Sequence, residues 1–315
     1  MKALVTGGAG FIGHHLVRAL VARGDDVAVI DDYSTGDPAR LDPLRSQIMV
    51  VEGSILDPDA LDAAMRGREV VFHEGALPSV ARSLLAPLAS NEVNVTGTIQ
   101  VMLAAARAGA RRVVYAGSSS VYGIPKTLPC SESFRPGPES PYGVSKLAAE
   151  LYVHTMGRHH GIATAALRYF NVFGEGQDPR SEYAAVIPRF VTALLTGQRP
   201  TVNGDGSVSR DFTHIDNVVA ANLLAARDDA PTGITCNIAC GERRTLLDLL
   251  RSIQDAAGRS VEPIFGPARA GDIQHSMADI TAAREGLGYQ VVVPFDEGIR
   301  RTVAWYQAGS SGSHG

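Results

Sequence analysis

The residues best suited to chemistry in this sequence are a tyrosine and a lysine four positions apart, Tyr142 and Lys146. Positions i and i+4 share one face of a helix, and the surrounding pattern predicts a helix from Tyr142 to about His159. A nearby ammonium lowers the pKa of a phenol, ordinarily about 10, toward the range in which a base is useful. The pair therefore predicts a tyrosine base, although the same spacing is also common on solvated helix faces.

A glycine-rich turn near the N-terminus indicates what such a base would work with. Apolar residues 3–6 predict a strand, and Gly7, Gly10 and Gly13 follow it before a helical pattern. Glycines at this spacing allow a tight turn, the approach of a pyrophosphate and close packing of helix on strand. A second predicted strand ends at Asp31, where a carboxylate can hold both ribose hydroxyls and repel a 2′-phosphate. The arrangement predicts dinucleotide binding, with NAD favoured over NADP.

Apolar runs recur along the chain with helical patterns between them. They predict further strands at 48–51, 70–72, 112–116 and 164–168. Near-continuous apolar strands that alternate with helices indicate a parallel sheet covered on both faces. The predicted fold class is α/β, a Rossmann-type doubly wound parallel sheet with a smaller mixed α/β C-terminal substrate lobe.

The regular alternation ends at residue 168, which sets the predicted domain boundary. Residues 1–168 are assigned to an NAD-binding Rossmann domain, which a later strand near 235–240 rejoins. Residues 169–308, turn-rich between their helices, are assigned mainly to a substrate lobe. Residues 309–315 (GSSGSHG) are typical of a tail or a vector-derived remnant.

Composition narrows the class of protein. The 315 residues are 45% hydrophobic with a formal net charge of −4, and the absence of a basic run argues against nucleic acid as a partner. No apolar stretch reaches ~18 residues, so no membrane span is expected. The sequence opens on a strand pattern, and Cys130, Cys236 and Cys240 form neither a disulfide framework nor a zinc motif. We expect a cytoplasmic protein without a metal site, whose cysteines pack in its interior.

A set of motifs together resembles the extended short-chain dehydrogenase/reductase family, specifically its NAD-dependent nucleotide-sugar (UDP-hexose) 4-epimerases. The resemblance covers about residues 1–306. Its motifs are 6–13 (TGGAGFIG), 118–123 (SSSVYG), 142–146 (YGVSK), 168–172 (RYFNV), 209–212 (SRDF) and 269–272 (RAGD). It implies an isomerase that inverts C4 of a UDP-sugar through a transient 4-keto intermediate, with Ser118, Tyr142 and Lys146 as catalytic residues.

The resemblance also implies two sets of binding residues. The NAD set is Gly7, Gly10, Phe11, Ile12, Gly13, Asp31, Asp32, Ser34, Thr35, Gly36, Ser54, Ile55, Gly75, Ala76, Asn94, Tyr142, Lys146 and Phe170. The substrate set is Pro78, Ser79, Ser118, Ser119, Ser120, Tyr142, Asn171, Val186, Ile187, Arg189, Asn203, Arg210, Arg269, Asp272 and Ser276. Planar, permanently charged guanidinium groups suit a diphosphate, so Arg210 and Arg269 are the expected phosphate anchors.

Four positions need separate comment. Family members often carry an aspartate where this chain has Ser54, and its loss is expected to weaken the hold on adenine. An apolar residue is usual at Glu74, for which the sequence offers no account. His73 has no evident proton partner, so we expect a structural role for it. The small Ser276 is expected beside the sugar, which implies a roomy pocket.

Several alternatives stay open. The sugar is glucose or galactose, an N-acetylhexosamine, or a glucuronate whose carboxylate Arg82 or Arg189 could meet. A 4,6-dehydratase needs an Asp–Glu pair where residues 118–120 are serines, and a UDP-glucuronate decarboxylase would release CO₂. A catalytically silent NAD-sensing protein would not need the Tyr–Lys pair. A homodimer is expected through the helices that begin near Asn91 and Tyr142.

Overall fold

A computed structural model describes residues 1–179, 185–268 and 273–311, with side chains as far as residue 309. Its largest element is a seven-stranded sheet in which all neighbouring strands are parallel. In spatial order the strands are β11 (Ile234–Ile238), β6 (Ala163–Tyr169), β5 (Arg112–Ser118), β4 (Val70–His73), β1 (Lys2–Thr6), β2 (Asp26–Asp31) and β3 (Ile48–Glu52). The order reverses between β1 and β4, the switch point of a doubly wound sheet, beside which ligands bind.

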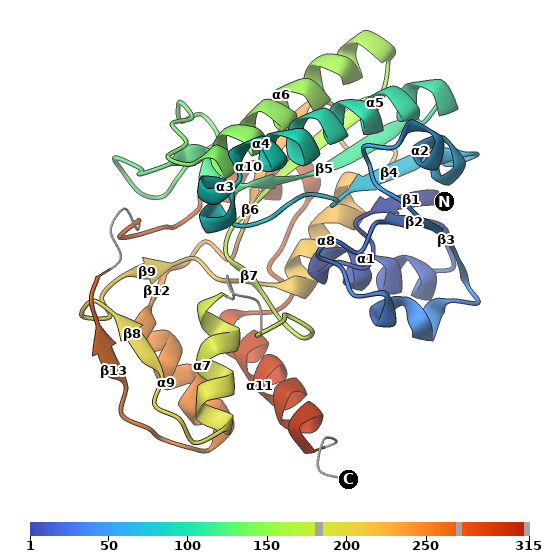
Figure 1. Ribbon diagram of the computed structural model, residues 1–315. Coiled ribbons are helices and arrows are strands. Elements are labelled where there is room, and N and C mark those ends of the chain that lie inside the picture. The colour runs from blue at the N-terminus through green and yellow to red at the C-terminus, as the bar shows by residue number, and fades with distance from the viewer. Residues whose placement is uncertain (180–184, 269–272, 312–315) are drawn as a thin grey trace.

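Helices cover both faces of this sheet (Figure 1). One face carries α2 (Pro58–Met65), α5 (Gly97–Ala108) and α6 (Pro141–His160). The other carries α1 (Phe11–Ala22), α8 (Ile215–Ala225) and α10 (Thr281–Leu287). Alternate strand residues point to opposite faces, so Leu4 packs in one core and its neighbour Val5 in the other. This two-sided burial explains why the strands appear in the sequence as near-continuous apolar runs.

A smaller lobe with a core of its own lies beside the carboxyl edge of the sheet (Figure 1). Its helices are α7 (Val186–Leu195), α9 (Leu246–Ala257) and α11 (Phe295–Ser311). The rings of Phe173, Phe212 and Phe295 pack between them. Its short strand pairs are β7 (Val172–Phe173) with β10 (Thr213–His214), β8 (Thr201–Asn203) with β13 (Ile264–Gly266), and β9 (Ser209–Arg210) with β12 (Arg244–Thr245). This confirms the predicted mixed α/β lobe.

Short helical elements connect these parts. They are η1 (Pro38–Leu44), α3 (Val80–Leu85), α4 (Pro87–Asn91), η2 (Glu92–Thr96) and η3 (Ser119–Tyr122). The helix expected to begin near Asn91 is instead α4, η2 and α5 in succession, because η2 is a π-helical turn. Such turns often lie at functional sites, and this one carries Asn94.

The predicted domain boundary at residue 168 does not match the packing, because some elements after it pack on the sheet. The expected return strand is β11, which pairs with β6. Helices α8 and α10 also come after residue 168, yet they pack on the sheet. We therefore propose that the sheet domain includes these three elements as well as residues 1–168. Helix α11 runs to Ser311 and includes the start of the expected tail, of which 312–315 lie outside the described residues.

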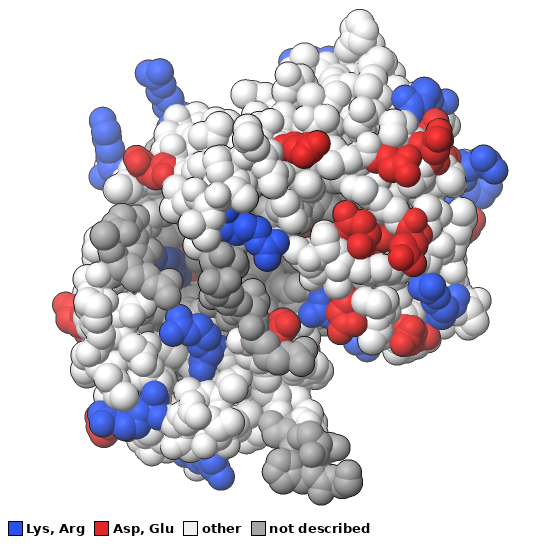
Figure 2. All heavy atoms as spheres, in the orientation of Figure 1, with Lys and Arg blue, Asp and Glu red and all other residues white. Residues whose placement is uncertain are grey.

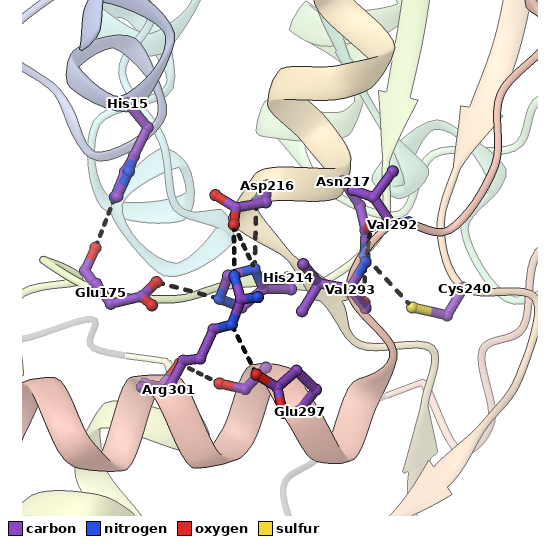
Figure 3. A network of polar contacts seen from close by, with 12 residues as sticks. His15, Glu175, His214, Asp216, Asn217, Cys240, Val292, Val293, Glu297 and Arg301 are labelled. Atoms are coloured by element: carbon purple, nitrogen blue, oxygen red, sulfur yellow. Dashed lines mark hydrogen bonds and ion pairs between the residues drawn. The ribbon is translucent and has the colours of Figure 1, made fainter. Parts of the chain in front are cut away.

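A network of polar side chains joins the lobe to the sheet domain (Figure 3). The Nε2–H of His214 donates to Glu175 at 3.1 Å, and Nδ1 accepts from the backbone N–H of Asp216 at 3.3 Å. Asp216, in α8, binds Arg301 of α11 at 3.0 Å. His214 is fully buried, and both of its ring nitrogens are hydrogen-bonded. These contacts hold α11 against α8 and so help to set the position of the lobe.

Among the helices of the described residues, none has the length and apolar character needed to cross a bilayer. The same residues hold no group of three or more His, Cys, Asp or Glu side chains arranged to bind a metal ion. The three cysteines are free thiols, and Cys130 and Cys236 are buried. Burial raises the pKa of Cys130 to about 11 and that of Cys236 and Cys240 to about 12. These side chains therefore pack as small apolar groups.

Candidate active site

Two adjoining cavities open along the carboxyl edge of the sheet. One, of about 380 Å³, lies over the glycine-rich turn and the ends of β2 and β4. The other, of about 820 Å³, lies between the sheet edge and the lobe. Gly117, Tyr142 and Tyr169 line both, so the cavities meet where β5 ends and α6 begins. Figure 2 shows this face hollowed between sheet domain and lobe, with Lys or Arg side chains on both sides of the hollow.

The glycine-rich turn fits the close approach of a dinucleotide. At Gly7, φ is +68°, and a Cβ there would lie 2.7 Å from the Cα of Gly75. A Cβ on Gly13 would lie 2.1 Å from the carbonyl oxygen of Gly7. Helix α1 begins directly after the turn without a side-chain cap, which leaves its first N–H groups for an anionic ligand. A pyrophosphate therefore finds both room and donors here.

Asp31 ends β2 at the side of the same cavity. Its carboxylate oxygens accept the backbone N–H groups of Ala9 and Tyr33, each at 2.8 Å. Burial raises the pKa of Asp31, and these hydrogen bonds oppose the rise. Each carboxylate oxygen can accept a second hydrogen bond, so ribose hydroxyls can bind to the same side chain. The residues present therefore fit NAD, with its ribose on Asp31.

Helix α6 carries the predicted base in its first turn. Ser140 caps the helix by accepting the N–H of Gly143 at 3.1 Å, and the backbone N–H of Tyr142 donates to Ser83 at 3.0 Å. The Tyr142 phenol is hydrogen-bonded to Ser118. Burial raises the pKa of this phenol, which is opposite to the direction expected from the Tyr–Lys spacing. The spacing argument left out desolvation, which disfavours the phenolate.

Lys146 lies one turn further along α6 and is buried. Its ammonium is 4.8 Å from the ring centroid of Tyr115, a cation–π distance. Burial lowers the pKa of Lys146 to about 8, while Glu74 and Glu150 act in the opposite direction. The charge of this lysine at neutral pH is therefore set by a balance between desolvation and two nearby carboxyl groups.

A run of serines at the end of β5 completes the centre. Ser118 Oγ lies 2.8 Å from Ser120 Oγ and accepts the N–H of Ser120 at 3.2 Å. The Ser118 hydroxyl thus contacts both the Tyr142 phenol and the turn that follows β5. Ser118, Ser119 and Ser120 all line the larger cavity. The predicted catalytic residues Ser118, Tyr142 and Lys146 therefore come together where the two cavities meet.

Most of the predicted NAD residues line the smaller cavity. They are Gly7, Gly10, Phe11, Ile12, Gly13, Asp31, Asp32, Ser34, Thr35, Ile55, Gly75, Ala76, Tyr142 and Lys146. Two others, Gly36 and Ser54, do not line it. Gly36 packs against the carboxylate of Asp31, and the Ser54 hydroxyl accepts the N–H of Leu56 at 3.3 Å.

Asn94 and Phe170 also lie away from the cavity wall. Asn94 is buried, exchanges hydrogen bonds with the backbone of Leu77 and donates to Ser145 at 3.0 Å. It therefore fixes the loop after β4 against α6. Phe170 is fully buried, with its ring centroid 6.1 Å from that of Tyr122. The preceding residue, Tyr169, lines both cavities instead; the alternation of side chains along a strand is the signal that could have identified it.

Most of the predicted substrate residues line the larger cavity. They are Ser79, Ser118, Ser119, Ser120, Tyr142, Asn171, Val186, Ile187, Arg189, Asn203 and Arg210. Pro78 lines the smaller cavity instead. Ser276 lines neither cavity, and its backbone N–H donates to the carbonyl of Ser209 at 3.1 Å. Gln274, two residues earlier, is on the wall of the larger cavity. Arg269 and Asp272 lie outside the described residues.

Two residues of the larger cavity have backbone conformations that are unusual for side chains with a Cβ. The value of φ is +97° at Ser79 and +35° at Asn171. Ser79 accepts the N–H of Arg82 at 3.2 Å, and Asn171 donates to the carbonyl of Asp211 at 2.9 Å. Conformations of this kind persist only where the surroundings hold them, and they concentrate at functional sites. Their position here is independent support for this cavity as the site.

His73 is buried below the smaller cavity. Its Nδ1 lies 2.8 Å from Thr6 Oγ1, and its Nε2 lies 2.9 Å from Thr98 Oγ1. Because Thr98 donates its own proton to the carbonyl of Asn94 at 2.6 Å, it accepts the Nε2–H of a neutral His73. Burial lowers the pKa of His73 to about 3. These contacts agree with the structural role expected for this residue.

Comparison with known proteins agrees with this geometry. Residues 3–239 match the NAD dependent epimerase/dehydratase family. The chain is 38% identical over 314 residues to a UDP-glucose 4-epimerase of Mycolicibacterium smegmatis, with 98% of this chain and 99% of the relative covered.

Solved structures are similar over almost the whole chain. The UDP-N-acetylglucosamine 4-epimerase from Methanobrevibacter ruminantium, in complex with UDP-N-acetylmuramic acid, has a TM-score of 0.93 at 35% identity, with 98% of each chain covered. The Thermus thermophilus UDP-glucose 4-epimerase complex with NAD has a TM-score of 0.88 at 32% identity, with 98% of this chain and 99% of that chain covered. The geometry and these matches together place the chain in the NAD dependent epimerase/dehydratase family, whose cofactor is NAD.

Proposed function

We propose that this protein is an NAD-dependent UDP-sugar 4-epimerase. The observation that carries the proposal is the position of Tyr142 and Ser118 at the junction of two cavities. The smaller cavity fits a dinucleotide, and the larger one opens toward the lobe. A sugar ring in the larger cavity would present its 4-OH to the phenol at this junction. The epimerase names of the relatives support the same reaction.

In this mechanism Tyr142 moves one proton and Ser118 orients the group that carries it. The phenolate takes the proton of the sugar's 4-OH, while Ser118 hydrogen-bonds the same oxygen. When bound, NAD would supply the acceptor for the hydride of C4 and the donor for its return. The sugar loses a proton and a hydride, so a planar 4-keto group forms. Return of the hydride on the opposite face, together with return of the proton from Tyr142 to the oxygen, inverts C4. General acid–base help of this kind is worth ~10²–10⁴-fold.

The charge around the phenol decides whether it can act as a base. Burial raises the pKa of Tyr142, so its ionised form needs a cation close by. Lys146 supplies an ammonium from the next turn of the same helix. Its hydrogen-bond donors also suit the ribose next to the nicotinamide, as the family resemblance implies. We therefore assign Lys146 to cofactor binding and to the charge balance of Tyr142.

The diphosphate has to stay bound while the sugar turns over. Arg210 and Asn171 line the larger cavity on the side of the lobe. The Arg210 guanidinium donates to the carbonyl of Ser209 at 2.9 Å, which fixes its direction. We assign Arg210 to the pyrophosphate because a guanidinium can bind two phosphate oxygens at once. Arg269 and Asp272 remain predicted anchors for the phosphate and the uridine ribose.

The sugar is proposed as a class. A cavity of about 820 Å³ has room for an N-acetylhexosamine as well as for glucose or galactose. A relative named for UDP-glucose and a solved structure named for UDP-N-acetylglucosamine support both. A glucuronate is the third candidate, with Arg189 on the cavity wall as the partner of its carboxylate. A 4,6-dehydratase is disfavoured, since its acid–base pair is replaced by Ser119 and Ser120.

The test is to incubate the NAD-loaded protein with UDP-glucose, UDP-galactose, UDP-N-acetylglucosamine and UDP-glucuronate and to follow C4 inversion by NMR. We expect inversion of at least one of these sugars, with deuterium placed at C4 retained in the product. Release of CO₂ from UDP-glucuronate would instead indicate a decarboxylase. Loss of the C4 deuterium to water, or no inversion in any of the four sugars, would refute the proposal.

We also propose that the protein is a homodimer through the face formed by α3, α4 and α6. Its support is the exposure of large apolar side chains there: Leu85 is 78% exposed, Leu88 84% and Leu151 58%. Sedimentation of the NAD-loaded protein should give twice the chain mass, and Leu151→Glu should lower it. A monomeric mass for the unmodified chain contradicts this. A cytoplasmic location is likewise proposed, supported by the free thiols and tested by cell fractionation.

A further inference from the structure

Glu74 is a charged residue that the proposed reaction has not yet used. It directly follows β4 and is half-buried, and its side chain lines the smaller cavity together with Lys146 and Tyr142. The hydroxyl of Tyr169 donates to Glu74 Oε1 at 2.9 Å, and Asn222 of α8 donates to that hydroxyl at 2.8 Å. The carboxyl group is therefore held in place by a chain of hydrogen bonds that reaches the far side of the sheet.

Among the described residues, the carboxyl groups that oppose the effect of burial on the pKa of Lys146 are those of Glu74 and Glu150. Both oxygens of Glu150 accept hydrogen bonds from Arg168, at 2.9 and 2.6 Å. The negative charge of Glu150 is thus largely offset by a guanidinium. Glu74 instead has a neutral phenol, Tyr169, as its hydrogen-bond donor, so its charge remains available to balance the ammonium.

We propose that Glu74 is a positioning residue of the active site, whose carboxylate keeps Lys146 protonated and thereby keeps a cation beside Tyr142. A buried lysine without a carboxylate nearby tends to lose its proton, because burial disfavours the charged form. Glu74, which lines the same cavity as Lys146, opposes this tendency. The inference rests on the proposed function in one respect, namely that the reaction uses this cation to stabilise the Tyr142 phenolate.

The protonation equilibria of the two groups support this coupling. Burial lowers the pKa of Lys146 to about 8, with Glu74 the first of the charges that oppose it. Burial raises the pKa of Glu74 to about 7, and the Tyr169 hydrogen bond and Lys146 act against the rise. Between pH 6 and 9, a change in the protonation of either group therefore alters the electrostatic surroundings of the other.

The phenols and the imidazole around the pair do not change charge in that range. Burial raises the pKa of the phenols of Tyr115, Tyr142 and Tyr169 above the ordinary value of about 10. Burial lowers the pKa of His73 to about 3, so this imidazole stays neutral. Glu150 stays paired with Arg168. Among these groups, the Glu74–Lys146 pair is thus the one that responds to pH near neutrality.

The chain allows a direct measurement, because its lysines are Lys2, Lys126 and Lys146. The NAD-loaded protein is labelled with lysine carrying ¹³C at Cε, and its NMR signals are followed from pH 6 to 11. Lys2 and Lys126 are exposed, so Lys2→Arg and Lys126→Arg assign the Lys146 signal by elimination without disturbing the site. We expect the pKa of Lys146 to fall by about one unit or more in Glu74→Gln.

Glu139→Gln is the matched control. It removes a carboxylate that is close to α6 in sequence but exposed, and it should leave the pKa of Lys146 unchanged. Tyr169→Phe is a second variant, which keeps Glu74 and removes its hydrogen bond. It should make Glu74 protonate more readily and so lower the pKa of Lys146 by a smaller amount. This variant also decides the matter if Glu74→Gln does not fold. If the pKa of Lys146 is unchanged in Glu74→Gln, or in Tyr169→Phe where Glu74→Gln does not fold, the inference is overturned.

Activity gives a second, independent readout. In Glu74→Gln the alkaline limb of the pH profile of kcat should move to lower pH by the same amount as the NMR pKa, with KM little changed. A profile that falls uniformly at every pH would show a structural effect only and would overturn the positioning role. Should no UDP-sugar be epimerised, the proposed function fails, while the NMR titration still decides whether Glu74 controls Lys146.

Discussion

Helix α6 places two charged residues one turn apart, Lys146 and Glu150, in two different kinds of buried surroundings. Glu150 is bound by both arms of the Arg168 guanidinium, at 2.9 and 2.6 Å. Arg168 also donates to Tyr122 at 2.8 Å, and Tyr122 donates to Asn237 at 2.6 Å. Burial acts to lower the pKa of Arg168, but Glu150 raises it. This region therefore favours the charged form of the guanidinium.

The surroundings of Lys146 have the opposite character. Among the described residues, no carboxylate lies within salt-bridge distance of its ammonium, and an aromatic ring lies 4.8 Å away. Burial moves the pKa values of Lys146, Glu74 and Tyr142 toward the neutral forms. Of these, Lys146 and Glu74 can gain or lose a proton near neutral pH, which suits a site of acid–base chemistry. The difference teaches that, on one helix, full pairing of charges serves stability, and incomplete pairing serves reaction.

The largest expected effect of a single change is on the reacting side. Tyr142→Phe should reduce kcat by about 10²–10⁴-fold, because the proton of the 4-OH then has no acceptor. The lost hydrogen bond to Ser118 should cost only about 1 kcal/mol of unfolding free energy. Turnover is measured by NMR, and bound NAD by its release on denaturation. Normal NAD content with lost turnover is the expected pattern; unchanged epimerisation contradicts the assigned role of Tyr142.

On the paired side, Glu150→Ala should act on stability. It leaves the buried guanidinium of Arg168 without its carboxylate, which typically costs about 3–5 kcal/mol. The double variant Glu150→Leu with Arg168→Met is the control, since a buried ion pair replaced by apolar groups is often nearly neutral. Denaturant midpoints are compared at a fixed excess of NAD, because bound ligand shifts apparent stability. Equal loss in the single and the double variant would contradict the argument from unpaired charge.

The comparison also shows which parts could be predicted from the sequence. The sheet was predictable because its strands are buried on both faces and its glycine-rich turn has few alternatives. The pair Tyr142 and Lys146 was predictable because helical spacing is local. The position of α8 on the sheet was not, since it depends on a return of the chain to β6 after the lobe has begun.

The wall of the active site was less predictable than its centre. Asn94 and Phe170 were placed on the NAD from the family pattern, yet Asn94 holds a loop and Phe170 fills the core. Ser276 was placed beside the sugar by counting along the chain from Asp272, yet it lines neither cavity. Glu74 had no account in the sequence because its partners, Tyr169 and Lys146, come from distant segments. The spacing of residues along the sequence does not reveal contacts between segments that are far apart in the chain.

His73 extends the comparison to pH, because this buried imidazole is kept neutral. Its pKa in the folded protein is about 3, below the ordinary value of 6.5, so the unfolded chain binds more protons between these values. Stability from this group is therefore complete above pH 6.5 and is lost as pH falls toward 3. At pH 5 the loss should be about 2 kcal/mol.

The check is the difference in unfolding free energy between the protein and His73→Gln, measured at pH 7 and at pH 5. The advantage of the histidine should shrink by about 2 kcal/mol at the lower pH. His159→Gln, which changes an exposed histidine of α6, is the control and should show no such trend. A difference that is constant with pH would mean that His73 accepts a proton in the folded state as easily as in the unfolded one.

The smallest expected effect comes from an ion pair that has the same length as the buried one. Arg107 of α5 and Asp62 of α2 approach to 2.6 Å, as Arg168 and Glu150 do. The side chains of the first pair are 48% and 49% exposed, against 6% and 4% for the second. A double-mutant cycle on Arg107→Ala and Asp62→Ala should give a coupling of about 0.2–1 kcal/mol that weakens with added salt. A coupling of several kcal/mol would mean that distance, and not burial, determines what a charge pair contributes, and the contrast between the two regions of α6 would lose its physical basis.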